Sequence, residues 1–164
     1  PYQKLRILTF LDPDRDPLGA GYQIIQSKIA IGSGGFSGKG FLQGTQSYLD
    51  FLPEKHTDFI FTLFSEEFGF LGSIGLLLLY TIIIFRIIRI GYISRSNFAK
   101  LFCFGFAFAI FIYVTVNLSM VLGLLPIVGS PLPIMSYGGS SMLATMIGFG
   151  IVMSAKIHSK QMIA

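Results

Sequence analysis

The feature that most restricts the fold of this chain is a long stretch without charge. No Asp, Glu, Lys or Arg occurs between Lys100 and Lys156, and all eight Asp and Glu residues lie at or before position 67. Only 12% of the whole chain is charged, against about 25% in an ordinary soluble domain. Because an unpaired charge in hydrocarbon costs on the order of 3 kcal/mol, a bilayer selects such stretches. The sequence therefore predicts an all-α integral membrane protein.

Three apolar segments are long enough to cross the roughly 30 Å of bilayer hydrocarbon, which takes about 20 residues. We predict membrane-spanning helices over 68–88, 101–125 and 137–155. Residues 89–100 and 126–136 would link them, the second as a loop that contains Pro126, Pro131 and Pro133. A large polar region, 1–67, precedes the helices, and a short tail, 156–164, follows them.

The basic residues predict the orientation of these helices. Residues 1–67 carry six Lys or Arg against eight acids, a net charge of −2, whereas the remainder carries six Lys or Arg and no acid. This basic excess sets membrane orientation and does not predict a nucleic-acid partner. By the positive-inside rule, 89–100 and 156–164 are cytoplasmic, so 126–136 and 1–67 are extracytoplasmic. That arrangement needs an upstream segment to carry 1–67 across, and we expect the chain to be the C-terminal part of a longer protein.

The region before the first span contains a glycine-rich stretch at 32–40, between a short helix expected at 21–31 and an apolar helix expected from Phe59. It is not a Walker A loop, because Ser33 and Gly40 stand where that loop needs Gly and Ser or Thr. Two interpretations stay open. The stretch is a bendable loop or re-entrant turn, or its N–H groups and Lys39 hold an anionic ligand.

Asp58 follows His56 and Thr57 at the expected helix start, and it also has two interpretations. In the structural one, Thr57 caps the helix and Asp58 complements the macrodipole in the first turn. In the functional one, the Asp58 carboxylate is a general base at a membrane-facing cavity. Glu54 lies four residues earlier, across a loop, and we do not interpret the two acids as a glycosidase pair.

Other polar residues give weaker signals. Of Glu66 and Glu67, where the first span enters the bilayer, we expect one to face solvent and the other the protein interior. Asn117, with Thr115 and Ser119, is polar within the second span and is typical of interhelical hydrogen bonding. Cys103 is expected to be a buried thiol, and two histidines with one cysteine predict no transition-metal site.

Three long, ordered stretches carry a resemblance to a known family. They are LDPDRDPLGAGYQIIQSKIAIGSGGFSGKGFLQGTQSYLDFLPEKHTDFIF at 11–61, EEFGFLG at 66–72 and PLPIMSYGGSSM at 131–142. Together they resemble the SEDS proteins (shape, elongation, division and sporulation). The residues of the first stretch are more similar to the rod-shape branch of the family than to its division branch. The resemblance implies a fold of ten spans, of which this chain is the large fourth external loop and the last three spans.

The resemblance also implies a function. Members of the family polymerise peptidoglycan from lipid II in the bacterial inner membrane, during elongation and rod-shape maintenance, with a class B penicillin-binding protein as the transpeptidase partner. The family's essential acid corresponds to Asp58. Its neighbours Glu54, Lys55, His56 and Thr57, together with the cation Lys39, are then candidate substrate-binding residues. The remaining spans of the family are absent here, so a site built from this chain alone would be incomplete.

The chemistry implied needs a base for a sugar hydroxyl and cationic help for a departing polyprenyl diphosphate. Lys28, Lys39 and Lys55 are the available cations; a divalent cation could assist, although the sequence shows no dedicated ligand set. Two other functions stay open, a lipid II flippase and a membrane scaffold for the transpeptidase. In the first, polar residues such as Asn117 would line a transport path.

Overall fold

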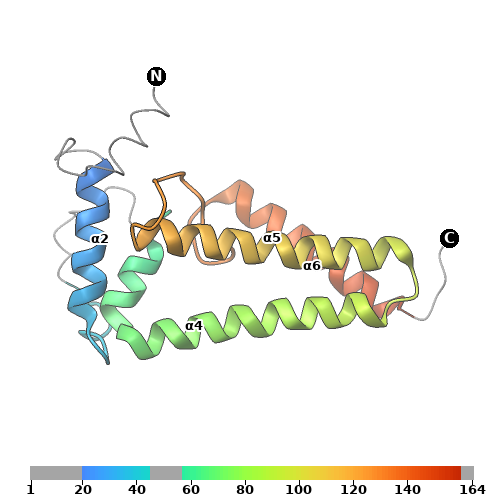
Figure 1. Cartoon of the computed structure of the whole chain (residues 1–164). Helices are drawn as coiled ribbons and strands as arrows, with labels where there is room; N and C mark the ends of the chain where they lie inside the picture. The colour runs from blue at the N-terminus through green and yellow to red at the C-terminus, as the bar shows by residue number, and fades with distance from the viewer. Residues whose placement is uncertain (1–19, 45–56, 160–164) are drawn as a thin grey trace, which may run out of the picture.

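The computed structural model describes residues 20–44 and 57–159 of the chain. Over these residues the structure contains helices and no strand. Figure 1 shows them in chain order: α2 (Ala20–Gly34), α4 (Ile60–Ile93), α5 (Asn97–Val121) and α6 (Gly139–Ile157). The expected helix at 21–31 is confirmed as α2, and the helix expected from Phe59 is confirmed as α4, which begins one residue later.

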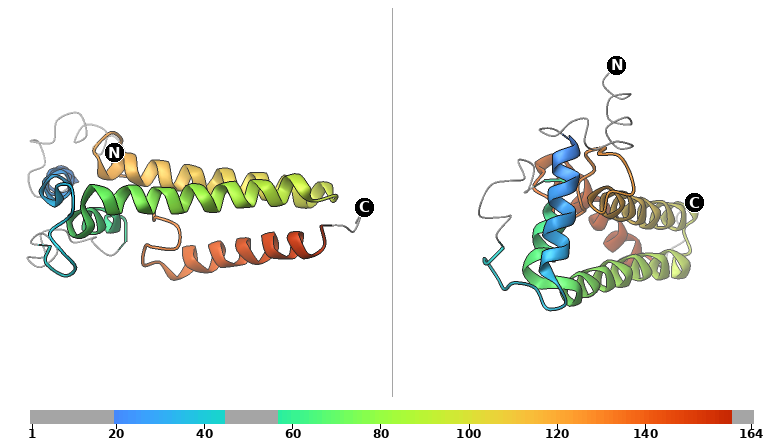
Figure 2. Two further views of the ribbon diagram at one scale, coloured as in Figure 1. Left: turned by 90° about the horizontal axis from the view of Figure 1, so that it is seen from below. Right: turned by 60° about the vertical axis from the view of Figure 1, so that its left-hand side comes forward.

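The three long helices run lengthwise beside one another, and α2 lies across one end of them (Figures 1 and 2). By length and composition α4, α5 and α6 could each cross a membrane, which confirms the predicted fold class. The ends differ from the predicted segments. α4 starts at Ile60, well before 68, α5 ends four residues before 125, and α6 begins two residues after 137.

The long helices pack through a narrow face of α5. Its buried residues recur every three or four positions, which places them on one side of the helix: Cys103, Ala107, Ile110 and Val114. A Cβ at Gly91 of α4 would crowd Cys103, and one at Gly148 of α6 would overlap the Phe106 ring. Small residues therefore allow close helix approach, as is usual between membrane helices. The expected buried Cys103 thiol is confirmed.

A break divides α4 near its start. Gly69 has φ of 66° and ψ of −160°, far from helical values and in a region that only glycine enters without strain. The part after the break, 70–93, is about 36 Å long at 1.5 Å per residue, which suits a membrane span. The predicted span began at Phe68, next to this break. The first turns of α4 are therefore a separate short arm.

The segment between α5 and α6 is irregular, as its prolines predicted, but its centre is buried. Leu132 is 1% exposed, and the Tyr80 hydroxyl, in the middle of α4, donates a hydrogen bond to the Pro133 carbonyl. The centre of the predicted loop 126–136 thus folds back among the helices. Irregular backbone at this depth is tolerated because protein surrounds it and supplies hydrogen-bond donors.

Candidate functional site

Asp58 lies in a turn before α4, and two hydrogen bonds hold the backbone of that turn. The Asn117 amide donates to the Asp58 carbonyl over 2.9 Å, and the Ser136 hydroxyl donates to the Thr57 carbonyl over 2.6 Å. α4 begins at Ile60 after the N-cap residue Phe59, so Thr57 is not the N-cap residue and Asp58 lies just before the first turn instead of within it.

Asn117 and Ser136 connect this turn to the segment between α5 and α6. The fully buried Asn117 amide also donates to the Ser130 carbonyl, over 2.7 Å, and the Ser136 hydroxyl accepts from the Leu132 N–H, also over 2.7 Å. The sequence predicted that the Asn117 side chain forms a hydrogen bond to another helix. Its acceptors are instead two backbone carbonyls outside the helices. Thr115, paired with it in the prediction, is exposed and bonds its own helix at the Phe111 carbonyl.

The Asp58 carboxylate lies against the same segment. Gly129 has φ of 77°, and a Cβ at this position would come 3.4 Å from Asp58 Oδ2. Asp58 is half-buried. A largely apolar cavity of about 770 Å³ has Ile60 and Ser136 in its wall, whereas Asp58 does not line it. The turn that carries Asp58 therefore adjoins this cavity through Ile60 and through Ser136, which binds the Thr57 carbonyl.

The glycine-rich stretch docks into the break of α4. The N–H groups of Lys39 and Gly40 donate to the carbonyls of Glu66 and Glu67, over 3.1 and 3.0 Å. In return the N–H groups of Phe70 and Leu71 donate to the carbonyls of Gly35 and Phe36, over 3.0 and 3.2 Å. These bonds replace the helical ones that the break removes.

Glycine is required on both sides of this contact. A Cβ at Gly38 would overlap the Glu67 carbonyl, one at Gly34 the Ser65 carbonyl, and one at Gly69 the Gly38 backbone. The N–H of Gly38 donates within the loop to Gly34. Because protein carbonyls occupy the N–H groups of Gly38, Lys39 and Gly40, these three groups do not form an anion cradle. The re-entrant turn is the interpretation that the geometry supports.

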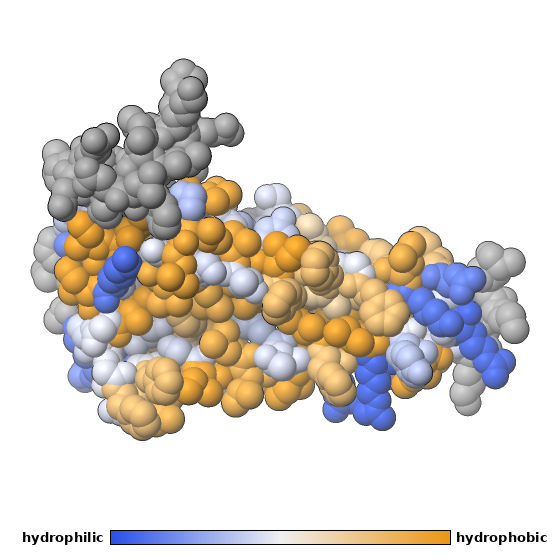
Figure 3. Space-filling model, viewed as in Figure 1, coloured by the Kyte–Doolittle hydropathy of each residue, from blue (hydrophilic) through white to orange (hydrophobic). Residues whose placement is uncertain are grey.

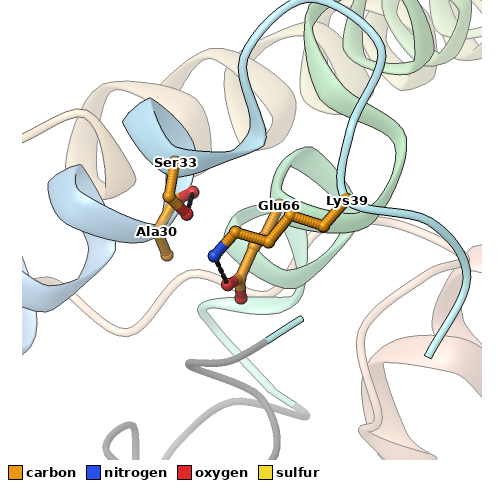
Figure 4. Close-up of polar contacts among 4 residues, drawn as sticks. All are labelled: Ala30, Ser33, Lys39 and Glu66. Carbon is orange, nitrogen blue, oxygen red and sulfur yellow. Dashed lines mark hydrogen bonds and ion pairs between the residues drawn. The ribbon is translucent and has the colours of Figure 1, made fainter. Parts of the chain in front are cut away.

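An ion pair adds to this junction (Figure 4). Lys39 Nζ lies 2.7 Å from Glu66 Oε1, the Glu66 side chain is fully buried and that of Lys39 is 28% exposed. Glu67, by contrast, is partly exposed, so the predicted division of roles between the two acids is confirmed. A buried carboxylate needs a close cation, and Lys39 supplies it.

The predicted site residues thus fall into three groups. Thr57 and Asp58 meet the α5–α6 segment, and Lys39 meets Glu66 in the break of α4. Glu54, Lys55 and His56 lie outside the described residues. Sequence reasoning missed the contribution of Gly129 and Ser136, although Ser136 lies within one of the three quoted stretches. Among the residues described, no three His, Cys, Asp or Glu side chains are grouped to hold a metal ion.

Comparison with known proteins identifies relatives along the whole chain. The model of the FtsW, RodA and SpoVE family, described as "Cell cycle protein", matches residues 1–161. The peptidoglycan glycosyltransferase MrdB of Escherichia coli K12 is 54% identical over 98% of this chain and 44% of its own length. Peptidoglycan glycosyltransferase RodA of Treponema pallidum is 44% identical, over 99% and 37%. Stage V sporulation protein E of Bacillus subtilis is 41% identical, over 98% and 43%.

Two solved structures share the fold. One, described as "Structural coordination of polymerization and crosslinking by a peptidoglycan synthase complex", superimposes with a TM-score of 0.75 at 42% identity, over 98% of this chain and 43% of that one. The other, a mutant of RodA from Thermus thermophilus, gives 0.63 at 37% identity, over 76% and 39%. The chain spans less than half the length of these relatives.

Proposed function

Because the chain belongs to the FtsW, RodA and SpoVE family of cell cycle proteins, also called SEDS, we propose that it is part of a peptidoglycan glycosyltransferase. The substrate is lipid II, and the product is the glycan strand extended during cell elongation. The support is the 54% identity to a relative that carries the glycosyltransferase name. The single structural observation that carries the proposal is that hydrogen bonds from Asn117 and Ser136 fix the turn that carries Asp58, and Ser136 also lines an apolar cavity.

Asp58 serves as the general base in the reaction proposed. Its carboxylate takes the proton of an acceptor sugar hydroxyl as the hydroxyl oxygen attacks the anomeric carbon of the lipid-linked donor. A new C–O bond forms, and the bond to the polyprenyl diphosphate breaks, so the diphosphate leaves with the electron pair. The apolar cavity is the side from which a lipid-linked donor would approach, because its wall offers few polar groups.

The departing diphosphate needs positive charge nearby, and three lysines are candidates to supply it. Lys39 is held by Glu66, which fixes its ammonium and lowers its availability for a second anion. Lys28 is exposed on α2, and Lys55 is a further candidate outside the described residues. A divalent cation stays a prediction for which the described residues show no ligand group, and no step is assigned to it.

The proposed partner is a class B penicillin-binding protein that crosslinks the strand. Its support is the solved relative, which is described as part of a complex that coordinates polymerization and crosslinking. We place the protein in the bacterial inner membrane, with 1–67 extracytoplasmic and the tail after α6 cytoplasmic. The distribution of Lys and Arg supports this orientation.

The decisive experiment is polymerisation of lipid II by the complete protein with its partner, comparing Asp58→Asn with the parent. Loss of a general base costs roughly 10²–10⁴-fold in rate. Asn keeps the size of the side chain and the backbone carbonyl that Asn117 binds, so we expect a folded, partner-binding protein that makes almost no glycan. Glu67→Gln is the matched control, because it removes one negative charge from the same end of the molecule and should polymerise normally.

Three outcomes would contradict the proposal. If Asp58→Asn polymerises at the parental rate, Asp58 is not the base. If the parent makes no glycan but moves lipid II across proteoliposomes, the protein is a flippase. If it does neither and still binds the transpeptidase, it is a scaffold.

A further inference from the structure

The turn formed by Leu132, Pro133, Ile134 and Met135 has an unfavourable residue near its centre. The Met135 N–H donates to the Leu132 carbonyl over 3.3 Å, and Ile134, the third residue, has φ of 72°. Because the proline ring fixes φ of the second residue near about −65°, a positive φ at the third identifies a type II turn. Glycine or asparagine is usual at that third position, and a β-branched side chain there strains the backbone. Contacts from the surrounding structure therefore hold the turn in this form.

Rotation of the peptide unit between Pro133 and Ile134 would remove this strain. The rotation changes ψ of Pro133 and φ of Ile134 together and gives a type I turn, in which the third residue has φ of about −90°. The carbonyl of this peptide unit belongs to Pro133, and it would turn to the opposite side. In the structure that carbonyl accepts the hydrogen bond of the Tyr80 hydroxyl, and both residues are buried. A single bond from α4 therefore opposes relaxation of the turn.

The residues that this turn positions belong to the proposed reaction site. The Ile134 side chain is 39% exposed and lines the cavity of about 770 Å³. Ser136, directly after the turn, donates to the carbonyl of Thr57, the residue before Asp58. A relaxed turn would therefore change the wall of the cavity and displace the hydroxyl that holds the Asp58 backbone.

We propose that Tyr80 is a positioning residue for the polymerisation proposed above, and this inference rests on that function. The Tyr80 hydroxyl keeps the peptide unit after Pro133 in its strained orientation, which directs Ser136 to the backbone beside Asp58. A glycine in place of Ile134 would give the same turn without strain, but the cavity wall would lose an apolar side chain. The isoleucine keeps that side chain in the wall, and Tyr80 supplies the bond that its backbone conformation requires.

The Tyr80→Phe variant of the complete protein, with and without Ile134→Gly, tests this role. Phenylalanine keeps the buried ring and removes only the donor, so the turn should relax and kcat for lipid II polymerisation should fall about 10-fold or more. Glycine adopts the positive φ without strain, so in the Ile134→Gly background Tyr80→Phe should lower kcat by about 2-fold or less. Equal losses of kcat in the two backgrounds would show that the hydroxyl acts independently of the strained turn, and would overturn the proposal.

Amide hydrogen exchange at Leu132 is a second measurement, and it needs no substrate. The Leu132 N–H donates to the Ser136 hydroxyl over 2.7 Å, so its exchange rate reports whether Ser136 stays in place. Loss of the Tyr80 bond to a buried carbonyl should accelerate this exchange about 5- to 100-fold, and Ile134→Gly should restore the parental rate. Unchanged exchange in Tyr80→Phe would overturn the proposal. A parent that makes no glycan would contradict the proposed function, whereas the exchange rates would still decide whether Tyr80 holds the turn.

Tyr92→Phe is the matched control, because it removes a hydroxyl from the same helix at a side chain that is 80% exposed. Its kcat and its exchange at Leu132 should equal the parental values, and losses as large as those of Tyr80→Phe would overturn the proposal. Ser136→Ala interrupts the same connection after the turn, so its kcat should fall and Ile134→Gly should not restore it. Parental kcat in Ser136→Ala would overturn the proposal even if Tyr80→Phe does not accumulate in the membrane.

Discussion

At the scale of single residues, the position of the candidate base depends on Asn117. Both neighbours of its carboxamide are carbonyl oxygens, so only its NH2 end satisfies them, and the side chain has one workable orientation. Its sequence neighbours are uncharged and mostly apolar, so the sequence alone identifies Asn117 as a polar residue within an apolar helix. Its partners lie 59 and 13 positions away in the chain, and no local pattern reveals them.

We expect Asn117→Leu to impair both folding and catalysis. The change leaves the carbonyls of Asp58 and Ser130 without this donor, which costs roughly 1–3 kcal/mol for buried groups. Release of the Asp58 turn should also lower lipid II polymerisation about 100-fold, as expected for a reacting group displaced by about 1 Å. Thermal unfolding in detergent and glycan synthesis at matched protein amounts measure the two effects.

The control for this change is Thr115→Val, two positions earlier in α5. Its hydroxyl is exposed and bonds only its own helix, so both unfolding and glycan synthesis should stay at parental values. A destabilised Asn117→Leu protein that still polymerises at the parental rate would contradict a positioning role for Asn117.

At the scale of elements, α4 combines two structures that the sequence did not separate. The long apolar run predicted a helix, because about 20 such residues suffice to cross hydrocarbon, and the helix is there. The break at Gly69 was not predicted, because isolated glycines are common in membrane helices. What makes this glycine different is the docking of residues 35–40, a contact between segments far apart in the chain.

The break predicts opposite effects for two glycines of the same helix. Gly69→Ala places a Cβ on a backbone with φ of 66° and against Gly38, so the free energy of unfolding should fall by roughly 2 kcal/mol or more. Gly75→Ala lies in regular helix with nothing within 4 Å, so it should be neutral or stabilise by up to about 1 kcal/mol. Unfolding midpoints of the two variants in one detergent provide the measurement, and equal midpoints would contradict the role assigned to the break.

At the scale of the whole molecule, the two ends of the bundle differ in chemistry. Asp58, the Lys39–Glu66 pair and the break of α4 lie at one end, and the basic α4–α5 link and the end of α6 lie at the other (Figures 1 and 3). The sequence predicted this polarity, because charge distribution along a chain of membrane helices maps directly onto the two sides. It did not predict that the segment with Pro133 would fold between the helices, since prolines mark irregular backbone without marking its depth.

This polarity gives a topology prediction for the complete protein on a Cys103→Ala background. In intact spheroplasts, a membrane-impermeant maleimide should label Ser37→Cys and should label Asn97→Cys only after permeabilisation. Both positions are exposed, whereas the neighbouring Ser94 is too buried to report on its side of the membrane. The reverse labelling pattern would contradict the orientation proposed, and with it an extracytoplasmic reaction.

The break in α4 also has a consequence for how the protein matures during translation. Residues 35–40, which form the backbone hydrogen bonds across this break, leave the ribosome before α4 does. The nascent helix therefore meets them as soon as it forms. The turn at Asp58 is the opposite case, because Asn117 and Ser136 are both synthesised after it. A chain stalled after α4 would therefore have a complete helical break and an unfixed carboxylate. The capacity for catalysis would be acquired only with the last two helices.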